Sequence, residues 1–176
     1  MAWFRQLYTE AMHFDRLPFS PQLIHARWTL GKLPSEDAPS LAQDALQFGH
    51  DGKNVRRIAG LVRPSQADLL PLMPGFLAEI GVSAPLAREQ AAWLLARLIA
   101  KGISERRVTP YEGARFIAYE IAIEVWPNQQ HPLLSFVGLA SDYEDCESYT
   151  WHPDKRRREI DEEIVEEARA VLASQE

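Results

Sequence analysis

Residues 110–126 read PYEGARFIAYEIAIEVW and decide the fold class, because they are apolar over more than half of a helical circumference. One stripe of this predicted helix consists of Ala114, Ile117, Ala118, Ile121 and Val125. A second set of side chains widens the stripe, namely Phe116, Tyr119, Ile123 and Trp126. A helix that is apolar so far around its axis is usually buried between other helices. We therefore predict a buried helix from Pro110 to Trp126 at the centre of a helical bundle.

Capping residues, prolines and glycines mark further helices on both sides of this segment. Thr109 and Glu112 form a capping box, and Ser20-Pro21 is an N-cap followed by proline at the first helical position. Asp51 is predicted to cap a helix, and Gly102 to end one. The predicted helices cover residues 2–14, 20–30, 40–48, 51–62, 73–80, 85–101, 110–126, 132–146 and 154–173, with a short turn at Ser65. Strand signals are almost absent, so we predict an all-α protein, a compact multi-helix bundle of about eight or nine helices.

The length of 176 residues and the apolar fraction of 46% suit one well-packed domain over residues 1–176. The proline-containing loop at 32–39 is a possible sub-boundary. The span Asp51–Leu61 resembles one half of a HEAT-type helical repeat, although no second copy follows at a fixed spacing. A HEAT-like helical scaffold is therefore one alternative function.

The distribution of cysteine and apolar residues predicts a soluble, cytoplasmic protein. Cys146 is the single cysteine, which excludes an intramolecular disulfide and a cysteine-based zinc site. The N-terminal residues lack the apolar stretch of a signal peptide, and no segment is long and apolar enough to span a membrane. No GxSxG, Walker, GxGxxG or HExxH motif occurs. We expect no cofactor and lean towards a protein that is not an enzyme.

The net charge of −6 is confined to one end of the chain. Residues 142–176 hold twelve acidic against five basic side chains, whereas residues 1–141 hold thirteen acidic against fourteen basic ones. A nucleic-acid-binding protein has the opposite bias, so we predict no nucleic-acid partner. An acidic end suits a basic protein partner, although many charge runs are only solvated surfaces. The sequence leaves the oligomeric state open.

Residues 136–151, FVGLASDYEDCESYTW, contain the most distinctive cluster of side chains. Carboxylates near a helix C-terminus oppose the helix dipole, so folding alone gives no reason for them. Three explanations stay open: a solvated helix end, docking of a basic partner, or metal binding with acid–base chemistry. The last would make the chain a metal-dependent hydrolase that uses Asp142 and Asp145. For partner docking, the candidate residues are Asp142, Tyr143, Glu144, Asp145, Glu147 and Trp151.

Two features of the last predicted helix concern its charges. The basic run Lys155–Arg158 is followed by acids four residues later, which favours internal pairing over nucleic-acid binding. Asp161 falls within the apolar arc of the same helix. A buried carboxylate needs a partner, and Arg115 is one candidate for it; the alternative is that this turn is exposed.

Several short motifs between residues 90 and 172 resemble those of uncharacterised bacterial helical proteins with no assigned activity. The motifs are Gly102-Ile103, Pro110–Arg115, Phe136–Ser141 with the acids after it, and Glu166–Arg169. The resemblance implies a helical fold and no catalytic residues. With the localised acidity, it leads us to predict a non-enzymatic bacterial partner-binding protein, such as an immunity protein or a small regulatory adaptor.

Overall fold

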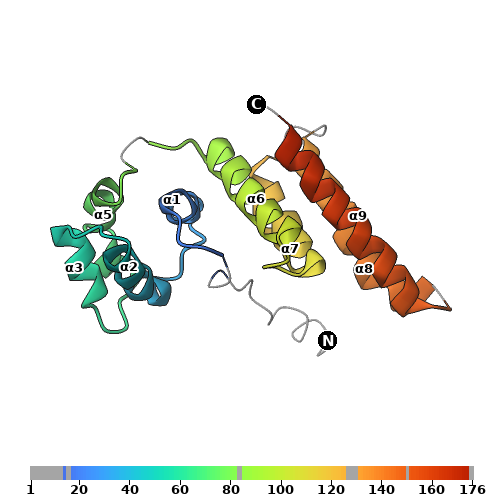
Figure 1. Ribbon diagram of the computed structural model, residues 1–176, viewed down its shortest axis with the longest axis horizontal. Coiled ribbons are helices and arrows are strands. Elements are labelled where there is room, and N and C mark those ends of the chain that lie inside the picture. The colour runs from blue at the N-terminus through green and yellow to red at the C-terminus, as the bar shows by residue number, and fades with distance from the viewer. Residues whose placement is uncertain (1–13, 15–16, 83–84, 126–130, 150, 175–176) are drawn as a thin grey trace. The chain divides into compact units, whose positions relative to one another are not determined.

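In a computed structural model of the chain, the regular secondary structure of the described residues is helical (Figure 1). The structure describes residues 14, 17–82, 85–125, 131–149 and 151–174, except for the side chains of residues 147 and 149. The all-α prediction is confirmed, because these ranges contain nine α-helices and no strand. The helices are α1 (Pro21–Leu30), α2 (Ala38–Gln47), α3 (Lys53–Ala59), α4 (Gln66–Leu69), α5 (Met73–Glu79), α6 (Arg88–Ser104), α7 (Pro110–Phe116), α8 (Ser135–Tyr149) and α9 (Pro153–Ala173). The helix predicted at 2–14 lies outside the described residues, apart from Phe14.

The chain folds into two compact units. One consists of Phe19–Leu95, and the other of Met1–Pro18 with Ala96–Glu176. We call them the N-terminal unit and the C-terminal unit. The prediction of a single domain with a sub-boundary at 32–39 stays a prediction; at this place a 3₁₀ turn, Ser35–Asp37, leads into α2.

Helix α1 begins and ends where its capping residues predict. The Ser20 hydroxyl accepts the Leu23 N–H, and Gly31 ends the helix with a φ of 71°. Because that angle lies in the left-handed region, glycine suits the position. The helix buries its inner face in the core of the N-terminal unit. This core comprises Ile24, Leu33, Ala38, Ala42, Ala45, Val55, Ile58, Leu69, Leu72, Met73, Phe76, Leu77 and Ile80.

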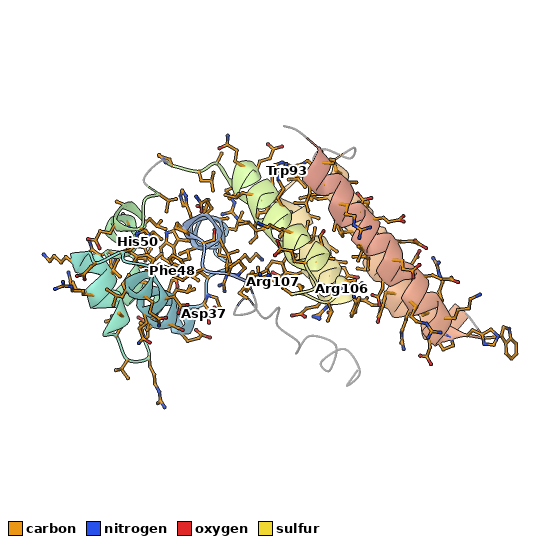
Figure 2. The ribbon with its side chains drawn as sticks, viewed as in Figure 1. Asp37, Phe48, His50, Trp93, Arg106 and Arg107 are labelled. Atoms are coloured by element: carbon orange, nitrogen blue, oxygen red, sulfur yellow. The ribbon has the colours of Figure 1, made fainter. Side chains whose placement is uncertain are left out.

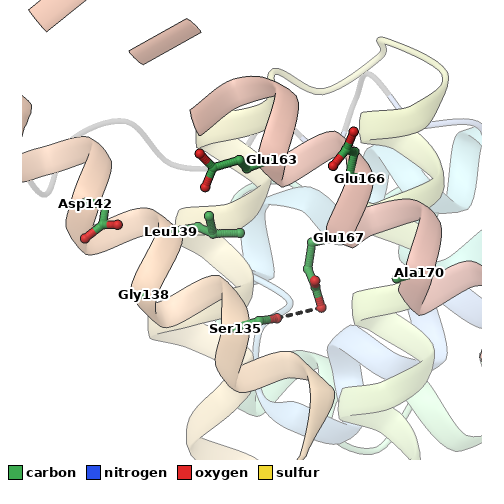
Figure 3. A pocket seen from close by; sticks show the side chains of 8 residues that line it. All are labelled: Ser135, Gly138, Leu139, Asp142, Glu163, Glu166, Glu167 and Ala170. Carbon is green, nitrogen blue, oxygen red and sulfur yellow. Dashed lines mark hydrogen bonds between the residues drawn. The ribbon is translucent and has the colours of Figure 1, made fainter. Parts of the chain in front are cut away.

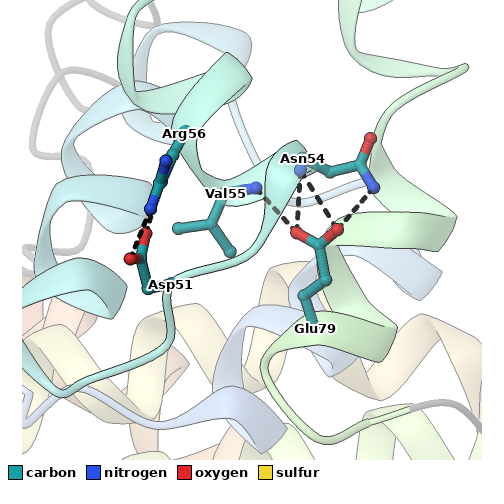
Figure 4. Close-up of polar contacts among 5 residues, drawn as sticks. All are labelled: Asp51, Asn54, Val55, Arg56 and Glu79. Atoms are coloured by element: carbon teal, nitrogen blue, oxygen red, sulfur yellow. Dashed lines mark hydrogen bonds and ion pairs between the residues drawn. The ribbon is translucent and has the colours of Figure 1, made fainter.

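The start of α3 is capped by a residue that is distant in sequence (Figure 4). The Glu79 carboxylate accepts the backbone N–H groups of Asn54 at 2.8 Å and of Val55 at 2.9 Å. The prediction that Asp51 caps this helix is wrong, because the Asp51 carboxylate binds the Arg56 guanidinium at 2.6 Å instead. The Glu79 carboxylate of α5 therefore accepts the two N–H groups that a capping side chain would bind.

We expect Glu79→Gln to destabilise the protein by about 1 kcal/mol at neutral pH, as loss of a helix cap does. Partial burial opposes ionisation, but the N–H groups of Val55 and Asn54 outweigh it and lower the pKa of Glu79. The stabilisation is therefore present above the unfolded pKa of about 4.3 and is lost as the pH falls through the folded value. Urea unfolding of both proteins across this acidic range checks the prediction. A difference in stability that does not shrink on acidification would contradict it.

The segment 110–126, predicted as one helix, is helical over its described residues 110–124, but it is not one regular α-helix. Helix α7 ends at Phe116, a π-helical turn covers Ile117–Ile121, and a 3₁₀ turn covers Ala122–Glu124. Tyr111 and Tyr119 are about 2.2 α-helical turns apart, so in a regular helix they would face different directions. The wider π turn rotates less per residue, which brings both hydroxyls to one carboxylate on α8.

The predicted buried stripe of this segment is confirmed. Its members are at most 6% exposed, namely Ala114, Ile117, Ala118, Ile121 and Val125. Helix α7 packs against α8 and α9, so it is buried between other helices of the C-terminal unit as predicted. The predicted extension of the stripe is wrong at Tyr119 and Ile123, which are 45% and 66% exposed. Trp126 lies outside the described residues.

The prediction that Gly102 ends α6 is also wrong, because this helix continues to Ser104. A methyl group on Gly102 would collide with the side chains of Leu17 and Val108, so the glycine permits close packing. The helix is instead closed by Arg106, whose φ is 58°. The N–H of Arg107 then donates to the Gly102 carbonyl at 2.8 Å. Figure 2 shows Arg106 and Arg107 at this end of α6.

Candidate protein-binding groove

Helices α8 and α9 pack side by side and form the acidic end of the C-terminal unit (Figure 1). Their facing surfaces are buried through side chains at helical spacing, which are Phe136, Ala140 and Cys146 on α8 and Ile160, Ile164, Ala168 and Val171 on α9. The apolar spacing in the sequence of α9 predicts an inner face that also includes Leu172. The four residues named are buried, and Leu172 is half-buried. Burial of these stripes turns the neighbouring polar faces of both helices outwards.

A groove with a volume of about 590 Å³ runs between these outer faces (Figure 3). Each helix contributes residues three, four and seven positions apart, because such positions share one helical face. The lining residues are Ser135, Gly138, Leu139 and Asp142 from α8, and Glu163, Glu166, Glu167 and Ala170 from α9. A methyl group on Gly138 would meet nothing within 4 Å. The lining of the groove therefore combines small or apolar residues with four carboxylates.

The two ends of the groove differ in how their carboxylates are paired. At one end the Arg156 guanidinium lies 2.9 Å from Glu163 and 3.9 Å from Asp142. The hydrogen bond that Arg156 donates to the Glu163 carboxylate raises the pKa of Arg156 above its ordinary value. At the other end Glu167 accepts the Ser135 hydroxyl at 2.7 Å. Among the described residues, neither Glu166 nor Glu167 has an ion-pair partner.

The predicted partner-binding residues point in several directions. Asp142 lines the groove, whereas the Tyr143 ring stacks on Tyr111 of α7 with 4.1 Å between ring centroids. Asp145 is exposed on α8. Trp151, between α8 and α9, is 97% exposed. The side chain of Glu147 lies outside the described residues.

Glu144 forms hydrogen bonds with two tyrosines of the neighbouring segment. Its carboxylate accepts the hydroxyls of Tyr111 at 3.0 Å and of Tyr119 at 3.1 Å. Burial and the bond to Glu144 raise the pKa of Tyr111. The Arg157 guanidinium lies 5.6 Å from the Tyr143 ring centroid, a cation–π distance. These contacts connect α8 to α7 and to α9.

Asp161 lies near Tyr143 and is partly buried. One of its carboxylate oxygens is buried and accepts no hydrogen bond from the described residues, so the candidate pair with Arg115 is not formed at this oxygen. Burial raises the pKa of Asp161. The charge of Asp161 in turn adds to burial in raising the pKa of Tyr143.

Metal binding finds no support at this end of the chain. Within the described ranges, no three His, Cys, Asp or Glu side chains gather closely enough to hold a metal ion. Cys146 is buried, and its thiol donates to the Asp142 carbonyl at 3.2 Å. The hydrolase that uses Asp142 and Asp145 stays a prediction from the sequence, without a structural observation in its favour.

Sequence reasoning missed most of the groove. Glu163, Glu166 and Glu167 lie on one face of α9, and their spacing of three and four residues is visible in the sequence. What the sequence does not show is that this face meets Asp142 and Ser135 of α8. That juxtaposition depends on how the two helices pack.

No protein-family model, curated protein or solved structure matches this chain. The resemblance of residues 90–172 to bacterial helical proteins therefore stays a prediction. In the part of the chain that the structure describes, every helix is too short or too polar to cross a bilayer.

Proposed function

We propose that this chain is a non-enzymatic bacterial partner-binding protein, of the immunity-protein or small-adaptor kind, whose groove between α8 and α9 binds a basic protein segment. The observation that carries the proposal is the groove itself, whose lining combines four carboxylates with Gly138, Leu139 and Ala170. Small residues between two helices let the backbone of a helix or an extended segment approach closely. Its charge attracts basic side chains and repels acidic ones.

Glu166 and Glu167 support the proposal most directly. Carboxylates in a structural network are normally paired, as Glu163 is with Arg156. Glu166 and Glu167 lack a cation among the described residues, and Glu166 is exposed. Their spacing from Glu163 along α9 corresponds to about one helical turn, or about 5.4 Å. Basic side chains one turn apart on a partner helix would match this arrangement.

The test is affinity capture from the source cell, with wild-type protein and a variant that carries Glu166→Gln and Glu167→Gln. We expect the wild-type chain to retain a basic protein, and the groove variant to bind the purified partner about tenfold or more weakly. The matched control carries Asp154→Asn and Glu162→Gln, which remove the same charge from α9 outside the groove. Equal weakening by both variants, or a partner that neither variant affects, would contradict the proposal.

A further inference from the structure

The segment 116–125 has an outer edge of large side chains, which we define as Phe116, Tyr119 and Ile123. Tyr119 and Ile123 are 45% and 66% exposed, whereas Ile121 between them and Val125 after them are buried. Phe116 is half-buried. Positions three and seven residues apart lie on one side of a helical segment. The outer edge therefore presents a row of large side chains on the surface of the C-terminal unit.

The N-terminal part of the chain meets this edge at Phe14. The ring of Phe14 lies edge-on against the ring of Phe116, with 5.2 Å between centroids and 85° between planes, which is a favourable aromatic geometry. Leu17 and Val108 both lie within 3.0 Å of the position that a methyl group on Gly102 would take. From Leu17 back to Phe14, the chain thus runs from the start of α7 to its end. The same direction leads the residues before Phe14 along the outer edge.

The sequence before Phe14 continues the apolar face to which Phe14 belongs. Residues 2–13 lie outside the described ranges, and their apolar spacing predicts a helix. Trp3, Leu7 and Ala11 precede Phe14 by eleven, seven and three positions, so in a helix they share its side. The opposite side carries polar side chains, namely Gln6, Thr9 and His13. Because Phe14 faces the outer edge, the apolar stripe of such a helix faces it too.

The spacings on the two segments match. Leu7 and Ile123 are each seven positions from the contact between the two phenylalanine rings, which corresponds to about 10 Å of helix on either side. Ala11 and Tyr119 are each three positions from the same contact. An antiparallel arrangement therefore places Leu7 opposite Ile123, and the small Ala11 opposite the large Tyr119 ring.

We propose that residues 2–13 form a helix that packs antiparallel to the segment 116–125 and covers Tyr119 and Ile123. Burial of apolar surface on both partners drives the docking. A helix of this length is marginal in water by itself, so its formation depends on the packing. Docking joins the N-terminal segment to the turn whose Tyr119 hydroxyl binds Glu144 of α8 at 3.1 Å. It does not require the groove between α8 and α9 to bind a partner.

Disulfide trapping in the full chain tests this register. The test variant carries Leu7→Cys with Ile123→Cys, and the control carries Thr9→Cys with Ile123→Cys. Both also carry Cys146→Ala, so that no other thiol is present. Leu7 and Thr9 are two positions apart, so they face different directions on a helix. We expect the Leu7 pair to form an intramolecular disulfide about tenfold faster than the Thr9 pair, because the bond needs Cα atoms within about 7 Å.

The same experiment identifies the other possible occupants of the edge. Equal rates for the two cysteine pairs overturn the proposed register. A disulfide between two chains, seen as a dimer on a non-reducing gel, means that a second copy supplies the helix and overturns docking within one chain. Urea unfolding checks that both variants are folded.

Hydrogen exchange measures the docking without introduced cysteines. We expect the amides of residues 2–13 to exchange about tenfold faster in Ile123→Ser than in the wild-type chain, because undocking exposes them. The matched control is Val62→Ser, which removes an 87% exposed apolar side chain from the N-terminal unit and should change nothing. A terminal segment opens before its unit unfolds, so this local readout detects docking that global unfolding does not.

Two results of the exchange experiment would overturn the proposal. One is exchange of residues 2–13 in the wild-type chain as fast as in an unfolded peptide. The other is an equal effect of Ile123→Ser and Val62→Ser, since docking at the outer edge requires that only the first accelerates exchange.

Discussion

Phe136→Ala is expected to lower the free energy of unfolding by about 3–5 kcal/mol. Phe136 lies in the first turn of α8 and is fully buried. Removal of its ring loses the transfer free energy of the buried carbons and leaves a cavity that the surrounding helices fill only in part. Since α8 packs against α7 and α9, the loss affects the C-terminal unit at the point where these helices meet.

Urea unfolding followed by circular dichroism measures this effect, and Ile123→Ala serves as the control. Ile123 belongs to the same unit but is 66% exposed, so its truncation should change stability by no more than about 0.5 kcal/mol. If Phe136→Ala costs as little as Ile123→Ala, the packing described for α8 is wrong.

Asp37→Ala is expected to destabilise the protein by about 2 kcal/mol, through the buried guanidinium of Arg27. The Arg27 side chain is 3% exposed and donates to Asp37 at 2.7 Å and to the Lys32 carbonyl at 3.2 Å. Burial lowers the pKa of Arg27, and the Asp37 carboxylate opposes that shift. Without Asp37, the buried guanidinium keeps its desolvation cost and loses the ion pair with that carboxylate.

A double replacement tests that explanation. In a chain that carries Arg27→Met and Asp37→Ala, the buried charge at position 27 is removed with its partner at position 37, so we expect most of the lost stability to return. Glu36→Ala is the control, because Glu36 is exposed beside Asp37. Thermal and urea unfolding of the three variants measure the comparison. A double variant less stable than Asp37→Ala alone would falsify the buried-charge account.

Local signals predicted the helices well because capping depends on neighbouring residues. Ser20, Gly31 and Thr109 act where their sequence context indicates, since each binds a backbone group within a few positions. Prediction failed where a distant residue intervened. Glu79 replaces Asp51 at the start of α3, and Gly102 lies inside α6, where the lack of a side chain leaves room for Leu17 and Val108.

The candidate site, like the helices, is predictable from the sequence only in part. Its acidic character is visible in the sequence, since the net negative charge is confined to the residues after Ser141. Its geometry is not visible there, because neighbouring residues on a helix point in different directions. Asp142 faces α9, whereas Tyr143 and Glu144 face α7. The sequence therefore predicts one acidic patch over residues 142–151, whereas the structure places only Asp142 of these residues in the groove.

The sequence by itself determined the all-α class, the acidic end, and the buried stripe of the segment that begins at Pro110, because periodicity and capping are local properties. Only the tertiary structure decided that this segment continues as a π turn and that α8 and α9 together form a groove. Both features depend on side chains that are far apart in sequence, such as Tyr119 with Glu144 and Ser135 with Glu167. Such pairs form only when packing brings the helices together, and a one-dimensional pattern does not encode which faces meet.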